Sequence, residues 1–457
     1  MLYELVSFTR SLFHATFKTN PWLRGILTGI TRVSRESVFS DLNNSDNDNF
    51  SILWGSVSVF LEVDANVLYN KSIRKFLNSV TKKGREEMKR MKRVFRLLCC
   101  LLLLAIPVSV QGATGKSAAT GAKLPAYKGV VTFEVGGADF NKDLRKALIA
   151  AMENKDSTKQ YKIVIKPGTY TLEYGMTLSS NVYIYAKGAI LKGPNSSTVT
   201  FKCEPGKSLK NIKIEGGVWD ATTQPKNYGI DTAIMRLAHV KNLVIQDATF
   251  LCKRGGHILE FSDINGMTIK GCTLSGNTIY RGVQPKEAIQ LDVATQPAMV
   301  YCTPYNGKGC HNVIIEKNQF VNVARGVGSH NEMMKIVEKN PYTNITIRNN
   351  SFKNMTGEAI FTMYFKNCTI EKNTIYNAKR AGIYMESCSY NKIYKNTIKK
   401  ISSFTGERKN YGTTKSGIHI RNTSNCSING NTLTQTSGGK VYLQELTCKE
   451  NVVKGNK

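Results

Sequence analysis

Carboxylate, imidazole and guanidinium side chains recur in three consecutive segments in the middle of the chain. The segments are GGHILEF (255–261), KEAIQLD (286–292) and RGVGSH (325–330). If they lie on neighbouring strands, pairs of their carboxylates are about 5–10 Å apart, the range used in glycoside hydrolysis. One carboxyl group would protonate the leaving oxygen, the other would activate water, and an imidazole could orient either one. We therefore predict four catalytic residues: Asp292, His330, Glu287 and Glu260.

Other ionisable and aromatic side chains in this part of the chain suit the binding of an acidic sugar. A guanidinium fork binds a carboxylate bidentately, as a uronic acid would require, and a tyrosine ring could stack on a sugar. The predicted substrate-binding residues are Arg325, Arg421, Glu386, Tyr384, His257 and His419. The alternative for these positions is a solvated strand face, on which alternation alone exposes charged side chains.

The elements that must position these residues belong to a repeat. A nine-residue phrase recurs along the second half of the chain, for example NLVIQDATF from Asn242, NITIRNNSF from Asn344 and NCTIEKNTI from Asn367. Short β-branched runs separated by Gly, Asn or Ser exclude helical repeats and predict a β-solenoid whose coils cover one another. Asn at the seventh position predicts a stacked ladder at a sharp corner. Its members are Asn318, Asn350, Asn373, Asn396, Asn431 and Asn451.

A further strand follows each phrase, and its outward side chains would line one face of the solenoid. Aligned, these strands include TAIMRL, GHILEF, EAIQLD, RGVGSH, EAIFTM, AGIYME and SGIHIR. Equivalent residues of consecutive coils would be about 4.8 Å apart in columns. One predicted column contains Arg236, Glu260, Asp292, His330, Met363, Glu386, Arg421 and Gln444, and its neighbour contains Gln290, Gly328, Phe361, Tyr384 and His419. Loop insertions after several of these strands would wall the face.

The start of the solenoid has a helical segment followed by a strand and a Pro-Gly turn. We expect an amphipathic helix over about 141–154, and IVIKPGTYTL (163–172) would form an early coil. With these features, residues 130–457 resemble the right-handed parallel β-helix proteins of the pectate-lyase-like superfamily. The resemblance implies an all-β fold, a right-handed parallel β-helix with an N-terminal capping helix. It does not choose a function, because this fold hosts lyases, hydrolases, epimerases and non-catalytic binders.

The placement of the site residues resembles that of polygalacturonase-type glycoside hydrolases, whose Asp, His and basic residues come from successive coils. The resemblance extends residue by residue to Asp292, His330 and Arg421 only. The paired aspartates of that family are absent here, and LDV, GVGSHN and HIR stand where its motifs would be. The reaction that this resemblance implies is hydrolysis of an acidic, uronate-containing polysaccharide.

Two alternatives stay open. In a polysaccharide lyase, Ca²⁺ or Arg would neutralise the uronate carboxylate, and Arg, Lys or His would remove the C5 proton. Arg325, His330 and Arg421 would fit that scheme. Ca²⁺ is the one cofactor it would add, although no compact acidic cluster for six to eight oxygen ligands is visible. A non-catalytic glycan-binding surface protein, or adhesin, would use the same face without cleavage.

The segments that precede the solenoid in the chain include a predicted targeting signal. Residues 88–112 have the form of a secretory signal peptide, with a basic cluster before a short apolar run. Residues 7–45 resemble a fragment of an uncharacterised AAA-ATPase-like family, so we interpret 1–87 as a doubtful N-terminal extension. A flexible leader is expected over 113–129 and the parallel β-helix domain over 130–457.

The net charge of the chain indicates an acidic partner. The chain has 63 Lys and Arg against 33 Asp and Glu, a net charge of +30. Its 41% hydrophobic and 21% charged residues exclude a disordered or collagen-like chain. Most of the excess charge follows the signal-like segment, so we predict an extracellular or cell-surface protein that binds an acidic polysaccharide. Nucleic acid is not expected as a partner, nor is a stable membrane span after signal cleavage.

Cysteine makes up 11 residues of the chain, too few for a disulfide scaffold. Cys302 and Cys310 bracket the loop TPYNGKG and are the candidates for a disulfide that closes it. Cys368 and Cys426 occupy equivalent positions in their coils, and we predict that they are buried thiols.

Overall fold

In the computed structural model, the described residues are 119–193, 199–204, 206–222, 233–253, 256–277, 285–300, 302–330, 334–402, 416–437, 439–443 and 448–457. All belong to one compact unit, Ala113–Lys457. The predicted AAA-ATPase-like fragment, the signal-like segment and Gln444 lie outside the described residues. No helix within these ranges is long and apolar enough to cross a membrane.

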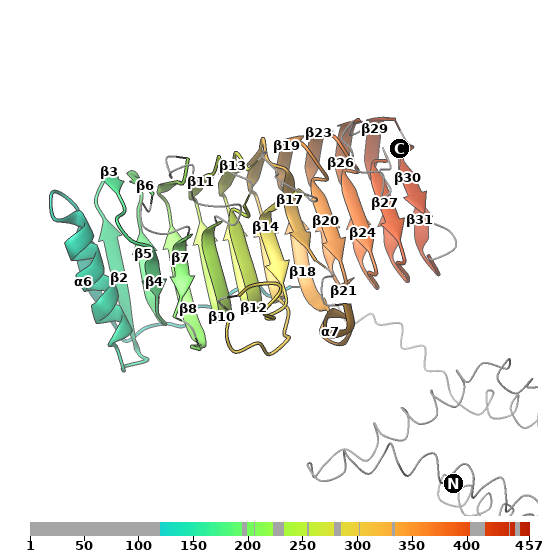
Figure 1. Ribbon diagram of the computed structural model, residues 1–457. Coiled ribbons are helices and arrows are strands. Elements are labelled where there is room, and N and C mark those ends of the chain that lie inside the picture. Colours follow the sequence, from blue (N-terminus) through green and yellow to red (C-terminus); the bar gives the residue numbers. More distant parts are fainter. Residues whose placement is uncertain are drawn as a thin grey trace, which may run out of the picture. The chain divides into compact units, whose positions relative to one another are not determined.

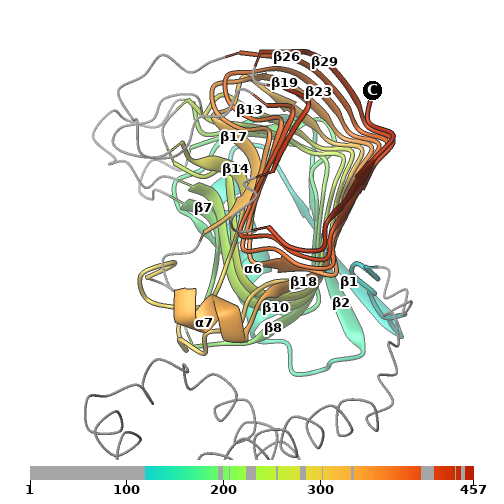
Figure 2. The ribbon, with the colours of Figure 1, turned by 90° about the vertical axis from the view of Figure 1, so that its right-hand side faces the viewer.

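The described chain winds into a right-handed parallel β-helix, as predicted (Figures 1 and 2). A typical coil contributes three strands, and each pairs in parallel with its equivalent in the next coil. The first strands of the coils are β4 Met176–Leu178, β7 Val199–Cys203, β14 Glu287–Asp292, β17 Arg325–Ser329, β20 Ile360–Met363, β24 Ile383–Glu386, β27 Ile418–Arg421 and β30 Val441–Leu443. Two longer strands, β10 Ala233–Gln246 and β12 Leu259–Lys270, continue without a break from the first position into the second.

The second strands join the first in one 21-stranded sheet, and the third strands form a separate 10-stranded sheet. The second strands are β1 Gly129–Val135, β2 Lys159–Ile165, β5 Val182–Tyr185, β8 Leu209–Glu215, β15 His311–Glu316, β18 Tyr342–Arg348, β21 Phe365–Lys366, β22 Thr369–Glu371, β25 Lys392–Tyr394, β28 Ser427–Asn429 and β31 Val452–Lys454. The third strands are β3 Gly168–Thr171, β6 Ala189–Lys192, β9 Val218–Asp220, β11 Thr249–Leu251, β13 Thr273–Ser275, β16 Gln319–Val321, β19 Ser351–Met355, β23 Thr374–Ala378, β26 Thr397–Ile401 and β29 Thr432–Thr436. We call the outward side of the first strands the site face and the 10-stranded sheet the third-strand sheet.

Inward-facing aliphatic side chains fill the solenoid and fix its register. One stack contains Ile289, Val327, Ile360, Ile383 and Ile418, each directly paired with the next and none exposed. Full burial of such a side chain stabilises the fold by roughly 1.5–3 kcal/mol. A shift of one residue would turn every inward side chain outward, so the stack determines which residues reach the site face.

The asparagine ladder at the corner before the third strands is confirmed, except at its end. Asn373 is unexposed; its Nδ2 donates to Ile347 O at 2.9 Å and to Asn396 Oδ1 at 3.0 Å, and its Oδ1 accepts from Asn350 N at 3.0 Å. The last member is Asn456, not Asn451, because Asn431 N donates to Asn456 Oδ1 at 3.0 Å. The strand register explains this difference. Because Ile428 pairs with Val453, the final nine-residue phrase starts five residues later than predicted.

A second asparagine ladder, which was not predicted, lies at the corner before the second strands. Asn242 Nδ2 donates to Asn211 Oδ1 and Asn211 Nδ2 to Asn181 Oδ1, both at 2.9 Å. Asn344 and Asn312 are linked in the same way at 3.3 Å. All five have φ between 55° and 64°. Asn adopts this left-handed conformation more readily than most residues, which explains its recurrence as the first residue of the phrase.

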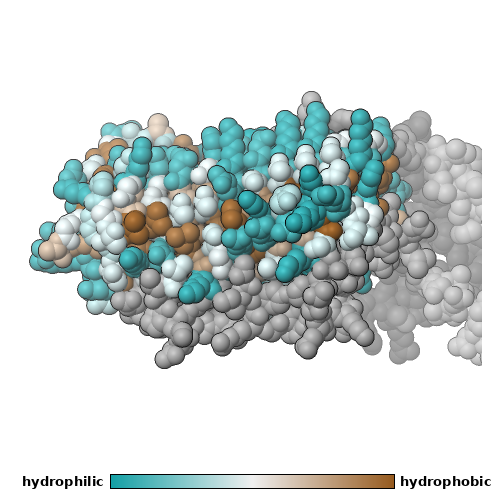
Figure 3. All heavy atoms as spheres, turned by 90° about the horizontal axis from the view of Figure 1, so that it is seen from above, coloured by the Kyte–Doolittle hydropathy of each residue, from teal (hydrophilic) through white to brown (hydrophobic). Residues whose placement is uncertain are grey.

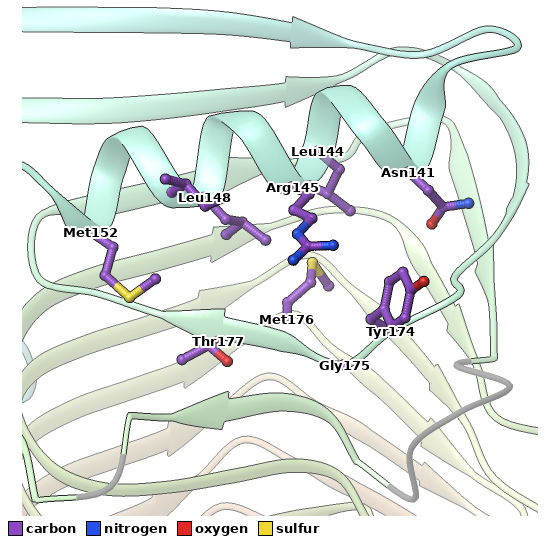
Figure 4. A pocket seen from close by; sticks show the side chains of 10 residues that line it. Asn141, Leu144, Arg145, Leu148, Met152, Tyr174, Gly175, Met176 and Thr177 are labelled. Carbon is purple, nitrogen blue, oxygen red and sulfur yellow. The ribbon is translucent and has the colours of Figure 1, made fainter.

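The capping helix is α6, Phe140–Met152, close to its predicted range, and it covers the first coil (Figure 1). Its buried face consists of Phe140, Leu144, Ala147 and Ala151. A cavity of about 370 Å³ lies between the helix and β4. Figure 4 shows Leu148 and Met152 of α6 and Met176 of β4 among the side chains that line it.

The described part of the predicted flexible leader, residues 119–128, is held against the solenoid, so this prediction is wrong for those residues. Ala122 N donates to Thr268 Oγ1 at 3.1 Å, Lys123 N to Asn242 Oδ1 at 3.2 Å and Lys128 N to Thr158 O at 2.9 Å. Gly121 is buried with φ 62°, and an added Cβ would lie 2.6 Å from Thr268 Oγ1. We call residues 119–128 the strap.

Insertions follow two first strands, as predicted for the walls of the site face. Residues 293–310 separate β14 from β15, and 330–341, with helix α7 (Met334–Lys339), separate β17 from β18. His239 secures the first insertion, because its ring nitrogens lie 2.7 Å from Asp263 Oδ2 and 2.7 Å from Cys302 O.

Replacement of one buried asparagine tests the ladder. We expect Asn373→Ala to lower the free energy of unfolding by roughly 1–3 kcal/mol, because buried backbone groups of two coils lose their partners. The exposed Thr374→Ala should change it by less than about 0.5 kcal/mol. Urea denaturation followed by circular dichroism measures both. Equal effects of the two variants would show that the ladder adds no stability.

Candidate active site

Glu287, from β14, is at the centre of a buried ionic cluster on the site face. Its Oε1 lies 2.9 Å from Arg325 Nη1, and its Oε2 lies 3.3 Å from His330 Nε2 and 3.4 Å from His257 Nδ1. These groups come from three adjacent coils, because Leu259 pairs with Ile289 and Glu287 with Arg325. The glutamate has no exposed surface. Four predicted site residues, His257, Glu287, Arg325 and His330, are therefore brought together.

A second glutamate completes the cluster. Glu358 Oε2 lies 2.7 Å from Arg325 Nε, and its Oε1 lies 3.5 Å from Arg380 Nη1. The Arg325 guanidinium carbon also lies 3.7 Å from the centre of the Phe361 ring. Two carboxylates and an aromatic face thus surround a guanidinium that is only 2% exposed. The predicted contact of Arg325 with a substrate carboxylate is not supported, because the fork is already occupied by the protein's own carboxylates.

The pKa values follow from burial and charge. Burial alone would raise the pKa of Glu287, but His330 and Arg325 lower it below its usual value. Burial also opposes ionisation of Glu358, yet Arg325 and Arg380 lower its pKa. Burial lowers the pKa of His257 well below its usual value, and Glu287 offsets only part of this. Glu287 and Glu358 are accordingly ionised and His257 is neutral near pH 7.

Gly328 makes room for the cluster. It pairs with Gln290 in one neighbouring strand and Phe361 in the other. A Cβ on this residue would lie 2.5 Å from Glu287 Cγ and 3.1 Å from Phe361 O. Only glycine therefore lets the glutamate side chain cross the face at this point.

Two further carboxylates lie beside the cluster. Glu260 Oε2 lies 2.6 Å from Arg236 Nε, and Asp292 Oδ2 accepts from Gln290 Nε2 at 2.9 Å. Both acids are at most 4% exposed. Burial raises the pKa of Glu260 above its usual value, and Arg236 offsets only part of the effect. This burial distinguishes the residues from the solvated strand face that was the alternative expectation.

The predicted columns are partly wrong in register. Glu260 pairs with Gln290 and Ser262 with Asp292, so Arg236 and Glu260 belong to the column of Gln290. The inward stack sets this register, because Leu259 pairs with Ile289 and Phe261 with Leu291. The rest of that column, Gln290, Gly328, Phe361, Tyr384 and His419, is confirmed. In the other column, Met363, Glu386 and Arg421 are adjacent as predicted.

Four predicted binding residues form a separate group on β24 and β27. Tyr384 Oη donates to Glu386 Oε2 at 2.8 Å, and Arg421 Nη1 lies 3.6 Å from Glu386 Oε1. The Tyr384 ring is stacked on Phe361 with centroids 4.8 Å apart, and the His419 ring meets it edge-on at 4.9 Å. Burial and Arg421 lower the pKa of His419 to about 4. Tyr384 is buried, so its predicted stacking on a sugar is not supported, whereas the Arg421 side chain is 38% exposed.

The predicted disulfide is absent. Cys302 and Cys310 are both free and buried. Cys302 Sγ lies 3.6 Å from Thr295 O, and Cys310 Sγ lies 3.6 Å from Phe261 O. Each thiol thus faces a backbone carbonyl rather than the other cysteine. Cys368 and Cys426 are buried thiols, as predicted.

Glu358 and Arg380 were missed by the sequence analysis. A signal for Glu358 existed in the aligned strands, where EAIQLD, RGVGSH and EAIFTM begin with Glu, Arg and Glu in consecutive coils. Arg380 lies in a turn outside the aligned strands, so the alignment carried no signal for it. Among the described residues, no group of three or more His, Cys, Asp or Glu could hold a metal ion.

Removal of the shared guanidinium tests the cluster. We expect Arg325→Met to lower the free energy of unfolding by roughly 3–5 kcal/mol, because two buried carboxylates lose their common partner. Arg421→Met, which removes a partly exposed guanidinium, should cost less than about 1 kcal/mol. The measurement is urea denaturation at pH 7. The proposed role of the cluster is wrong if both variants lose the same stability.

Comparison with known proteins agrees with the architecture. Residues 306–457 match the family model described as right handed beta helix region. No curated protein is detectably similar in sequence. Similar solved structures include ORF18 of Geobacillus virus E2, with 10% identity, TM-score 0.50 and coverage of 70% of this chain and 60% of that chain. Another is PfbA, a surface adhesin of Streptococcus pneumoniae, with 16% identity, TM-score 0.49 and coverage of 72% of this chain and 93% of that chain. A third is an exopolygalacturonase of Thermotoga maritima, with 9% identity, TM-score 0.43 and coverage of 73% of this chain and 94% of that chain.

These identities are low enough that the likeness concerns the fold and not the activity. The matched region begins in the insertion before β15 and extends through the last described strand. With the stacked three-strand coils and the asparagine ladder, it identifies the fold as a right-handed parallel β-helix.

Proposed function

We propose that this protein is an extracellular enzyme that binds an acidic, uronate-containing polysaccharide and cleaves it by hydrolysis at the site face. Glu260 is the general acid, Asp292 is the general base, and the His330 imidazole orients the reacting groups. Glu287 and Arg325 position these groups without touching the substrate.

The observation that carries the proposal is the placement of Glu260 and Asp292 on the paired strands β12 and β14, two residues out of register. Asp292 is two residues further along β14 than Gln290, the direct partner of Glu260. Strand spacing and rise place two such positions about 8 Å apart. This agrees with the roughly 6.5–9.5 Å separation of the carboxyl groups in inverting glycosidases, which leaves room for a water molecule. The raised pKa of Glu260 suits a proton donor.

Two buried polar atoms beside Asp292 support a ligand at this position. Ser262, its direct strand partner, and Gln290 have no exposed surface. Ser262 Oγ and Gln290 Oε1 form no hydrogen bond with the residues that the structure describes. Buried polar atoms are nearly always satisfied in native proteins, so substrate hydroxyl groups or the attacking water are suitable partners.

The buried cluster has a supporting role in this scheme. Ionised Glu287 lies within 3.4 Å of both imidazoles, and Arg325 and Glu358 hold Glu287 in place. The His330 side chain is 12% exposed, whereas that of Glu287 is fully buried. His330 is therefore the member of the cluster that reaches the substrate. Arg421 remains the candidate for the uronate carboxylate.

The reaction is tested with polygalacturonate, alginate and glycosaminoglycans as substrates. Hydrolysis releases reducing ends without an unsaturated product, whereas a lyase product absorbs in the ultraviolet. Appearance of that product would establish the lyase alternative, in which a cation or Arg neutralises the carboxylate. Binding without either product would establish a glycan-binding protein and would contradict the assignment of Glu260 and Asp292.

Neutral analogues test the two carboxyl groups. We expect Glu260→Gln and Asp292→Asn each to lower kcat at least about 100-fold on the substrate that is cleaved, since each removes a proton-transfer group. Glu338→Gln, which changes an exposed glutamate on α7, is the matched control and should retain full activity. The steady-state release of reducing ends gives these values. Full activity of both site variants would place the chemistry elsewhere.

The pH profile tests the role of Glu260 as the acid. An acid must be protonated, so activity falls as the pH rises through the Glu260 pKa. Arg236 lowers that pKa, and Arg236→Gln should therefore move the basic limb of kcat/KM to higher pH. Lys286→Gln, which removes another nearby cation, should shift it in the same direction by less. A shift to lower pH would contradict the assignment.

A further inference from the structure

Much of the positive charge on the site face is paired with the protein's own carboxylates. The arginines there are engaged by carboxylates: Arg236 by Glu260, Arg325 by Glu287 and Glu358, Arg380 by Glu358, and Arg421 by Glu386. The third-strand sheet differs. Its strands β16, β19, β23, β26 and β29 contain no acidic residue. Figure 3, which views the molecule from above, shows hydrophilic side chains projecting in rows.

Four lysines gather over β19, β23 and β26. Lys353 pairs with Tyr376, which pairs with Lys399, so the two lysines flank an exposed aromatic ring. They are two coils apart, a spacing of about 9–10 Å. Lys395 precedes β26, and Lys400 lies within it, with Nζ 5.7 Å from the centre of the Tyr376 ring. All four are exposed, and none forms an ion pair with an acidic residue in the described ranges.

Hydroxyl groups form a second column beside these lysines. Ser351, Thr374, Thr397 and Thr432 are paired in sequence along the sheet, and all are exposed. Adjacent hydroxyl groups are about 4.8 Å apart. The surface therefore alternates cations with groups that both donate and accept hydrogen bonds.

The backbone gives an independent indication that the lysines have a use. Lys395 and Lys400 have φ of 55° and 63°, in the left-handed region. At the corner of Lys395 the preceding coil has Lys372 and the following coil Gly430, and at that of Lys400 the preceding coil has Asn377 and the following coil Gln435. Asn and Gly adopt this conformation at lower cost than Lys. Lysine thus stands at two corners where Asn or Gly occupies several of the equivalent positions, which is a reason to seek a function for its side chain.

We propose that Lys353, Lys395, Lys399 and Lys400 form a second binding surface for an acidic polysaccharide, whose chain runs across the coils of the third-strand sheet. The carboxylates contact the lysines, the sugar hydroxyls contact the Ser/Thr column, and a sugar ring packs on Tyr376. A membrane would require inserted apolar side chains, whereas Tyr376 is the one large apolar residue of these three strands that is substantially exposed. This surface rests on the proposed class of substrate but needs no cleavage.

The test compares two quadruple variants of equal charge. One replaces Lys353, Lys395, Lys399 and Lys400 with Gln, and the other replaces Lys142, Lys146, Lys155 and Lys187, four exposed lysines of the capping helix and the first coils. Calorimetry with polygalacturonate at about 0.15 M salt measures Kd, with the fully methyl-esterified polymer as neutral counterpart. We expect the first variant to weaken binding roughly tenfold or more and the second by much less. The neutral polymer should bind weakly to all proteins.

Several results would overturn the proposal. Equal weakening by both variants would show that only net charge matters, and unchanged binding by the first would place the polymer elsewhere. Preference for duplex DNA over polygalacturonate at equal salt would assign the surface to nucleic acid. Cleavage of a short oligosaccharide should be unchanged in the first variant. Failure of the proposed function would show as absent cleavage by every protein, with the binding comparison still decisive for this surface.

Discussion

Stacking of each coil on the next is the constraint on which the rest of this structure depends. Parallel strands satisfy their backbone groups only in the neighbouring coil, and the inward column from Ile289 to Ile418 allows a single register. Given that register, outward residues of adjacent coils must meet, whether or not their charges agree. The packing of the core therefore determines which side chains meet on the site face. Glu287 lies beside Arg325 because Ile289 lies beside Val327.

The same constraint made the fold predictable from the sequence. The nine-residue phrase identified the coils, its asparagines identified a corner, and the helix before the first coil identified the cap. The errors in the predicted register were local. The last phrase was misplaced by five residues, so Asn451 was chosen in place of Asn456. The first two site-face strands were aligned by their acidic ends rather than by their inward residues, which set Glu260 beside Asp292 instead of Gln290.

The candidate site was predicted only in part, because composition does not tell how deeply a residue is buried. The alignment placed His330 in an outward column and Glu287 and Arg325 at the starts of adjacent strands. It could not show that Glu358 and Arg380 would close around the guanidinium and withdraw it from a ligand. Arg325 and Arg421 look equivalent in the sequence, yet one is 2% exposed and the other retains 38% of its side-chain surface. Their expected roles in binding and in stability diverge for that reason.

The strap has a consequence for the order of events during folding. Coils of a solenoid ordinarily interact with their nearest neighbours, so the array can assemble from any point. Ala122, however, is bonded to Thr268, 146 residues later, and Lys123 to Asn242. The strap leaves the ribosome before the coils on which it lies, and it cannot dock until β10 and β12 have stacked. Its docking closes a long chain loop and ties the first coils to the middle ones, which makes their unfolding a joint event.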